Sequence, residues 1–147
     1  YNMVRHGATM TYEAWDDKFK NNQDWNHAWG AAPANVIPRY VVGVQPLEPG
    51  FARMLILPQT SLLKSVEAVV PTIRGSVVVD IDSTAEKYDM RVTIPANAVA
   101  EVYLPLLAEA EELLIDGVSA PLILTEDRRI ECGEIGSGEH TFEVRWK

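Results

Sequence analysis

The sequence has almost no cysteine and no long apolar run. Cys132 is the single cysteine among 147 residues, so no internal disulfide and no cysteine-based metal site can form. The flanking strand pattern predicts that its thiol is buried or half-buried. No apolar stretch approaches the roughly 20 residues that cross a bilayer, and no signal-peptide pattern is present. We therefore expect no membrane partner, and the lack of disulfides does not identify a compartment.

Basic residues are scarce as well. There are 13 Lys and Arg against 21 Asp and Glu, which gives a net charge of −8. Nucleic-acid surfaces need clustered Lys and Arg, so we expect no nucleic-acid partner. Gly-rich phosphate loops and nucleophile elbows are also missing. His6 and His140 lie in different regions, so we expect no metal and no cofactor.

What the sequence does have, from about Gly50 onward, is a series of short strands separated by turn residues. Alternation places Val77, Val79 and Ile81 on one strand face, and two later segments show the same pattern. The expected strands are FARMLILPQ, LKSVEAVVPT, GSVVVDID, YDMRVTIPA, VAEVYLPL, EELLIDG, RRIECGE and HTFEVRW. Eight strands without intervening helices indicate a mainly β fold, an antiparallel β-sandwich. LLAEAEELLI also fits a short helix, which we rank below the strand.

The first fifty residues differ in character. Five large aromatic residues gather between positions 12 and 29, namely Tyr12, Trp15, Phe19, Trp25 and Trp29. The run HAWGAAPANVIPRYVVGV has helical spacing, with Asn26 as a cap, a kink or restart at Pro38 and a stop at Gly43. So short a segment cannot bury these faces by itself, and we expect it to pack against a partner outside the chain.

The stretch QPLEPGF, residues 45–51, is expected to be a stiff link between the two regions, because it has two prolines and a glycine. This divides the chain into residues 1–45 and 46–147. The chain starts YNMVRHG, without an initiator methionine or a helix start. We interpret it as part of a longer protein.

Two residues in the first region have competing interpretations. Glu13 follows Thr9 and Thr11, and such a residue is most often a capping or first-turn acid. It is alternatively a general base beside a sugar, and the neighbouring aromatic residues favour this slightly. His27 is either a structural histidine or a hydrogen-bond partner of a sugar hydroxyl.

Three further acids, Asp16, Asp17 and Asp24, are expected to be solvated loop charges.

The combined motifs change this balance. GATMTYEAWD, followed by NHAWGAAPANVIPRYVVGVQPLEPGFARMLILPQ, resembles the C-terminal part of bacterial α-L-rhamnosidases of glycoside hydrolase family 78. PTIRG and VTIPANAVAEVYLP resemble the tail module of that family, so the resemblance covers essentially the whole chain. Met10 and Tyr12 depart from the usual Thr and Trp beside Glu13.

The resemblance implies a large (α/α)6 barrel flanked by β-sandwich domains, and hydrolysis that inverts the anomeric configuration. Residues 1–45 would be the C-terminal end of the barrel, and residues 46–147 the C-terminal β-sandwich. The general base of the family falls on Glu13, and its rhamnose-contacting histidine falls on His27. Trp15, Trp25 and Trp29 would form an apolar wall against the sugar or belong to the barrel core.

The expected partners are a rhamnose-containing glycoside or polysaccharide and the upstream barrel of the same protein. The general acid would lie in that upstream part, so this chain alone is expected to be inactive. Its helical leader would then be partly disordered or packed on a second copy. The compartment of such a bacterial enzyme, whether periplasm, cytoplasm or exterior, is left open.

Three alternatives stay open at this point. The first is a non-catalytic carbohydrate-binding β-sandwich. The second is a structural module that docks on a partner. The third is part of another (α/α)6 glycosidase that acts on a different sugar. The first requires aromatic residues on one strand face. The β region offers Phe51, Tyr88, Tyr103, Phe142 and Trp146, mostly at positions expected in the core. It shows no convergent acids either.

Overall fold

The computed structural model describes residues 2–8, 11–24, 27–61 and 63–147. The contacts between residues group the chain into two compact units, Tyr1–Ile37 and Pro38–Lys147. Within the described residues, no helix combines the length and apolar character needed to cross a membrane. Met10, Trp25 and Asn26, to which the sequence assigns roles, lie outside the described residues.

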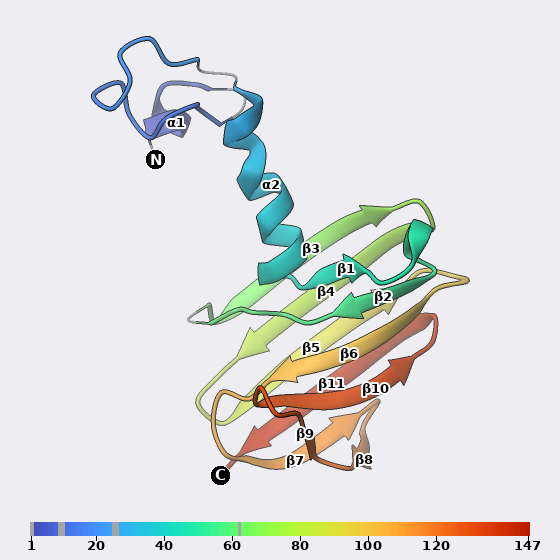
Figure 1. Cartoon of the computed structure of the whole chain (residues 1–147). Coiled ribbons are helices and arrows are strands. Elements are labelled where there is room, and N and C mark those ends of the chain that lie inside the picture. The colour runs from blue at the N-terminus through green and yellow to red at the C-terminus, as the bar shows by residue number, and fades with distance from the viewer. Residues whose placement is uncertain (1, 9–10, 25–26, 62) are drawn as a thin grey trace. The chain divides into compact units, whose positions relative to one another are not determined.

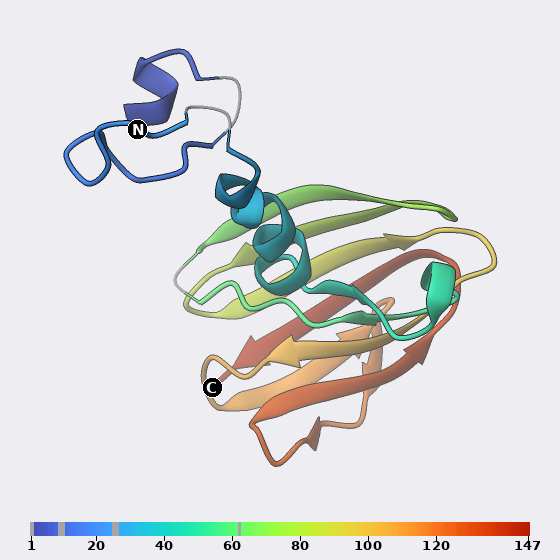
Figure 2. The same ribbon diagram turned by 45° about the horizontal axis from the view of Figure 1, so that its top comes forward.

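Two β-sheets make up the second unit (Figure 1). The five-stranded sheet contains, in spatial order, β1 (Val44–Pro46), β2 (Arg53–Ile56), β6 (Val99–Pro105), β10 (Arg129–Ile135) and β9 (Ile123–Leu124). The six-stranded sheet contains β3 (Ser65–Thr72), β4 (Gly75–Ser83), β5 (Lys87–Ile94), β11 (Gly138–Trp146), β7 (Ala110–Ile115) and β8 (Val118–Ala120). Figure 2 shows the two sheets stacked face to face.

The predicted mainly β sandwich is confirmed, with each of the eight expected strands in place. The second part of LLAEAEELLI, Ala110–Ile115, forms strand β7, and no part of this segment is helical, in agreement with the preferred interpretation. Three strands were not predicted, namely β1, β8 and β9, because two or three residues are too few to show alternation. The sandwich is also not wholly antiparallel, since β2 pairs with β6 in parallel.

Alternation explains the core between the sheets. In β4, Val77, Val79 and Ile81 are buried, while Asp80 and Asp82 between and after them are exposed. The five-stranded sheet contributes buried residues such as Met54 and Leu104 to the same cluster. Tyr88, Phe142 and Trp146 are buried as well. These aromatic residues therefore belong to the core and form no exposed row, as the sequence predicts.

The helical run expected before Gly43 is present but divided. It begins with a 3₁₀-helix, η1 (Ala28–Ala31), continues as α2 (Ala32–Val36) and ends as a π-helix, η2 (Ile37–Val41). The change of helix type coincides with Pro38, which cannot donate a backbone hydrogen bond. Gly43, at φ +86°, ends the run, as predicted. A four-residue helix, α1 (Asn2–Arg5), lies near the start of the chain.

The expected link at residues 45–51 is not a separate spacer, because its first two residues belong to a sheet. Gln45 and Pro46 belong to β1, where they pair with Leu55 and Met54 of β2. A short 3₁₀-helix, η3 (Pro49–Phe51), follows. Pro46 is tolerated because β1 is an edge strand of its sheet, and Pro49 lies in the first turn of η3, where a proline is tolerated. The assignment of residues 1–45 to a barrel and 46–147 to a sandwich domain stays a prediction.

Candidate functional site

Glu13 and Asp24 are joined by their backbones in the first unit. The Glu13 N–H donates to the Asp24 carbonyl oxygen at 3.0 Å. In return, the Asp24 N–H donates to Glu13 Oε2 at 3.2 Å. The other carboxylate oxygen, Oε1, forms an ion pair with Lys20 Nζ. The last two contacts hold the Glu13 side chain, which is only 13% exposed.

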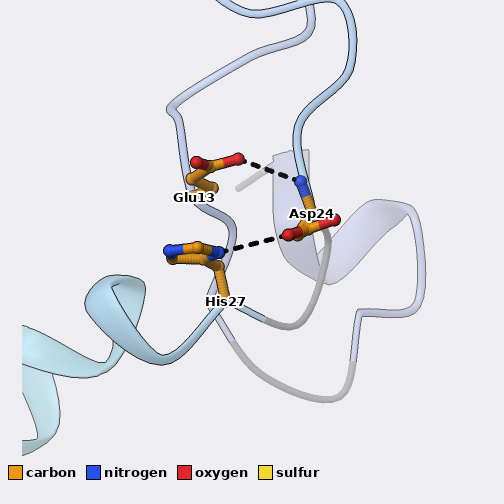
Figure 3. A group of neighbouring side chains, drawn as sticks. All are labelled: Glu13, Asp24 and His27. Carbon is orange, nitrogen blue, oxygen red and sulfur yellow. Dashed lines mark hydrogen bonds and ion pairs between the residues drawn. The ribbon is translucent and has the colours of Figure 1, made fainter.

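His27 is held by the same aspartate (Figure 3). Its Nδ1 lies 3.3 Å from Asp24 Oδ2, and its ring meets Trp29 edge-on, with centroids 5.0 Å apart. A carboxylate only accepts, so the Nδ1 proton points at Asp24 and Nε2 carries the lone pair in the neutral ring. Nε2 is buried and has no hydrogen-bond partner among the described residues.

The surroundings of Glu13 favour its ionised form. Hydrogen bonding from Lys20 is the largest cause of a pKa below the usual value, and the backbone N–H of Asp24 adds to it. Partial burial acts in the opposite direction. At neutral pH the Glu13 side chain is therefore an oriented carboxylate that can accept a proton.

Glu13, Asp24 and His27 each bring one potential metal-ligand atom to within 4.8 Å of the others. From the sequence we expected no metal site, and nothing in the sequence indicated that these three residues lie close together. Within the described residues the Glu13 carboxylate already has a cation, Lys20, and Nδ1 of His27 already faces Asp24. The arrangement is that of a hydrogen-bonded polar cluster.

An apolar hollow of about 570 Å³ lies beside Glu13. Trp15 and Trp29 line it together with aliphatic residues such as Val36 and Ile37. Both tryptophans are more than 80% exposed. Gly30 allows close packing here, because a Cβ at this position would lie 2.2 Å from the Tyr12 carbonyl oxygen. A carboxylate at the edge of an apolar, aromatic hollow is a geometry that suits a sugar ring.

The structure thus brings together all four site residues predicted from the sequence. Glu13, Trp15 and Trp29 line one hollow, and His27 lies against Trp29. Sequence reasoning missed Lys20, and it treated Asp24 as a solvated charge. The Asp24 side chain is indeed 74% exposed, but its backbone and carboxylate organise the other two polar residues. The spacing of three residues between Asp24 and His27 was the sequence feature that could have predicted their contact.

The six-stranded sheet has a second hollow of about 420 Å³, and more than half of the residues that line it are charged. Register places Asp82, Asp89 and Glu143 side by side on β4, β5 and β11. The expectation that no acids converge in the β region is therefore wrong, because it ignored cross-strand pairing. Lys87 Nζ lies 2.8 Å from Asp89 and 3.5 Å from Glu143. This lysine offsets the repulsion between like charges that face each other across strands.

Comparison with known proteins gives consistent matches. Residues 43–114 match the family described as bacterial alpha-L-rhamnosidase C-terminal domain. An α-L-rhamnosidase of Alteromonas sp. (strain LOR) is 34% identical over 69% of this chain, which corresponds to 12% of that enzyme. The chain therefore spans only a small part of this curated relative.

Solved structures show the same relationship. The α-L-rhamnosidase from Dictyoglumus thermophilum matches 98% of this chain with a TM-score of 0.82 and 26% identity, over 17% of its own length. The Streptomyces avermitilis α-L-rhamnosidase, solved with L-rhamnose, matches 97% with a TM-score of 0.78 and 21% identity, over 14% of its length. At that identity the second match supports the fold alone.

Proposed function

The chain resembles the C-terminal part of bacterial α-L-rhamnosidases, and from this premise we propose that it belongs to an inverting glycoside hydrolase of family 78. In this proposal residues 1–45 are the C-terminal end of an (α/α)6 catalytic barrel, and residues 46–147 form the β-sandwich that follows it. The substrate is a glycoside or polysaccharide with terminal α-L-rhamnose. The upstream barrel is the partner of the first unit.

The observation that carries the proposal is that Glu13, which lines the apolar hollow, is linked to His27 through Asp24. In an inverting hydrolase, one carboxyl group protonates the leaving oxygen while the other takes a proton from attacking water. The two stand roughly 6.5–9.5 Å apart. Glu13 is the base in this scheme, because its surroundings favour the carboxylate. The acid is supplied by the upstream part of the protein.

The remaining residues bind the sugar. His27 contacts a rhamnose hydroxyl and limits rotation of the ring. Trp15 and Trp29 offer apolar faces to the methyl group and to the ring carbons, since C–H groups pack well on aromatic faces. Several apolar side chains of the first unit are exposed, including Val4, Phe19 and Ile37. Such exposure is what a segment removed from a larger core would show.

A non-catalytic role has one observation in its favour. The matched family region, residues 43–114, lies wholly within the second unit. That unit by itself fits a structural C-terminal domain or a carbohydrate-binding module. In the proposed enzyme it has the structural role.

The base assignment is tested by Glu13→Gln in a protein that joins this chain to its barrel. Glutamine keeps the shape but cannot accept the proton, so we expect kcat to fall on the order of 10²–10⁴-fold with little change in KM. Glu67→Gln, an exposed position on β3, is the matched control and should retain full activity. Near-parental kcat for Glu13→Gln would remove Glu13 from the mechanism. Proton NMR of the first sugar released tests inversion, which requires β-L-rhamnose.

A second prediction concerns the 147-residue chain alone, which should not hydrolyse an aryl α-L-rhamnoside. Without the acid the leaving oxygen is not protonated, and without the barrel the sugar is not oriented. Release of the aryl group is followed by absorbance, and the mass in solution is measured by light scattering. Turnover equal to that of a complete rhamnosidase would show that the chain holds a whole site.

A further inference from the structure

Lys20 is the cationic side chain in contact with Glu13 among the residues that the structure describes. It lies seven residues further along the chain, and its Nζ forms an ion pair with Glu13 Oε1. The lysine side chain is 41% exposed, whereas that of Glu13 is 13% exposed. The ammonium group thus reaches in from the solvent side to a sheltered carboxylate.

Both oxygens of Glu13 have a donor, and the two donors come from different parts of the loop. Lys20 contacts Oε1, and the backbone N–H of Asp24 contacts Oε2. An ionised carboxylate has about four lone-pair positions, so each oxygen keeps one that can accept a proton from water. Two donors on separate segments also stop the carboxylate from rotating.

The other charged groups near Glu13 do not replace this lysine. The side chain of Asp24 is anionic and faces Nδ1 of His27. His27 adds a smaller favourable effect on the Glu13 carboxylate, and only when it is protonated. Among the described residues, the permanent positive charge beside Glu13 is therefore that of Lys20.

We propose that Lys20 is a positioning residue that keeps Glu13 ionised and oriented for water activation. This rests on the proposed function, in which Glu13 is the base. Removal of the lysine should leave a carboxylate that protonates more readily and rotates more freely. The enzyme would then lose activity first on the acidic side of its pH range.

The ion pair can be tested without measuring activity, in the protein that joins this chain to its barrel. Carbon-13 NMR follows the Glu13 side-chain carboxyl through an acid titration, and its signal is assigned by its loss in Glu13→Gln. Lys20→Met should move the Glu13 titration to higher pH, and Lys20→Arg should restore it. Lys18→Met is the matched control, because Lys18 Nζ lies over the Phe19 ring and not at Glu13. An unchanged titration in Lys20→Met, or an equal shift in Lys18→Met, would overturn the proposal.

The catalytic consequence is tested in the protein that includes the barrel. For Lys20→Met, the acidic limb of the kcat/KM profile should move to higher pH, while Lys20→Arg keeps it in place. At neutral pH Lys20→Met should retain far more activity than Glu13→Gln. An acidic limb that does not move would overturn the role of Lys20. If Glu13→Gln itself is active, the proposed base is wrong, whereas the carboxyl titration still reports on the ion pair.

Discussion

Tyr12 and Glu13 are adjacent in the sequence but have different surroundings. Tyr12 is 4% exposed, and its hydroxyl is hydrogen-bonded to His6 Nδ1 at 3.2 Å. Glu13 meets Lys20 and the backbone of Asp24. The resemblance places a tryptophan where this chain has Tyr12. Because Tyr12 is buried, we expect the replacement of tryptophan by tyrosine to affect mainly the packing of this side chain. The polar groups that hold Glu13 are its neighbours.

Cys132 gives a prediction at the residue scale. It lies at the irregular register between Glu131 and Gly133 in β10 and packs against the core. Burial raises the pKa of its thiol to about 12. At pH 8 about one thiol in ten thousand would be ionised, compared with about a quarter of ordinary cysteines. We expect iodoacetamide to label the folded chain at least about 100-fold more slowly than the chain in urea.

Intact mass against time measures this labelling, and the same cysteine in urea is its own control. Because burial disfavours the thiolate, the rate in the folded chain should rise as pH is increased toward 12. Equal rates in the folded and unfolded chain at pH 8 would show that the thiol is freely accessible.

At the scale of elements, Gly43 joins the π-helix η2 to strand β1. Its φ is +86°, and a Cβ would lie 2.1 Å from the carbonyl carbon of Leu57. The Leu57 N–H also donates to the Gly43 carbonyl oxygen at 3.0 Å. Neither backbone can move away without loss of this bond. Only glycine fits the junction.

Gly43→Ala should therefore lower the free energy of unfolding by about 2–4 kcal/mol, from backbone strain and steric overlap together. Gly117 has a similar φ of +76° in the turn between β7 and β8, but no atom lies within 4 Å of its Cβ position. Gly117→Ala should cost only about 1–2 kcal/mol. Urea unfolding of both variants measures the difference, and equal losses would contradict the overlap at Gly43.

The elements that could be predicted are those with enough residues to show a period. Strands β4, β5 and β11 have eight or nine residues each, and their alternation identifies both the strand and its buried face. Strand β9 has two residues and is formed only by pairing with β10. The stretch 45–51 has the composition of a linker, but its first residues are held by pairing with β2.

The candidate site was predictable only in part, for a related reason. Local sequence left Glu13 and His27 ambiguous, and the resemblance to a family singled them out. Lys20 and Asp24 act through a loop that doubles back on itself. No periodic pattern marks such a contact, so their partners became visible only in three dimensions.

For the whole molecule, the two units differ in how much core they possess. Every residue of the hydrophobic core cluster, from Val42 to Trp146, lies in the second unit. The first unit has Tyr12 as its buried apolar residue within the described part of the chain. A segment of this size without a core of its own is not expected to be stable alone.

Residues 38–147 should therefore fold as an autonomous sandwich, and a shorter piece, 50–147, should be less stable. The shorter piece lacks β1 and the side chains of Val42 and Val44, each 2% exposed in the core. Burial of a valine contributes about 1.5–3 kcal/mol, so the free energy of unfolding should be lower by about 3 kcal/mol or more. Amide dispersion tests folding, and urea transitions of the two pieces give the difference. A collapsed spectrum for 38–147 would contradict its autonomy, and equal stability of both pieces would show that β1 is dispensable.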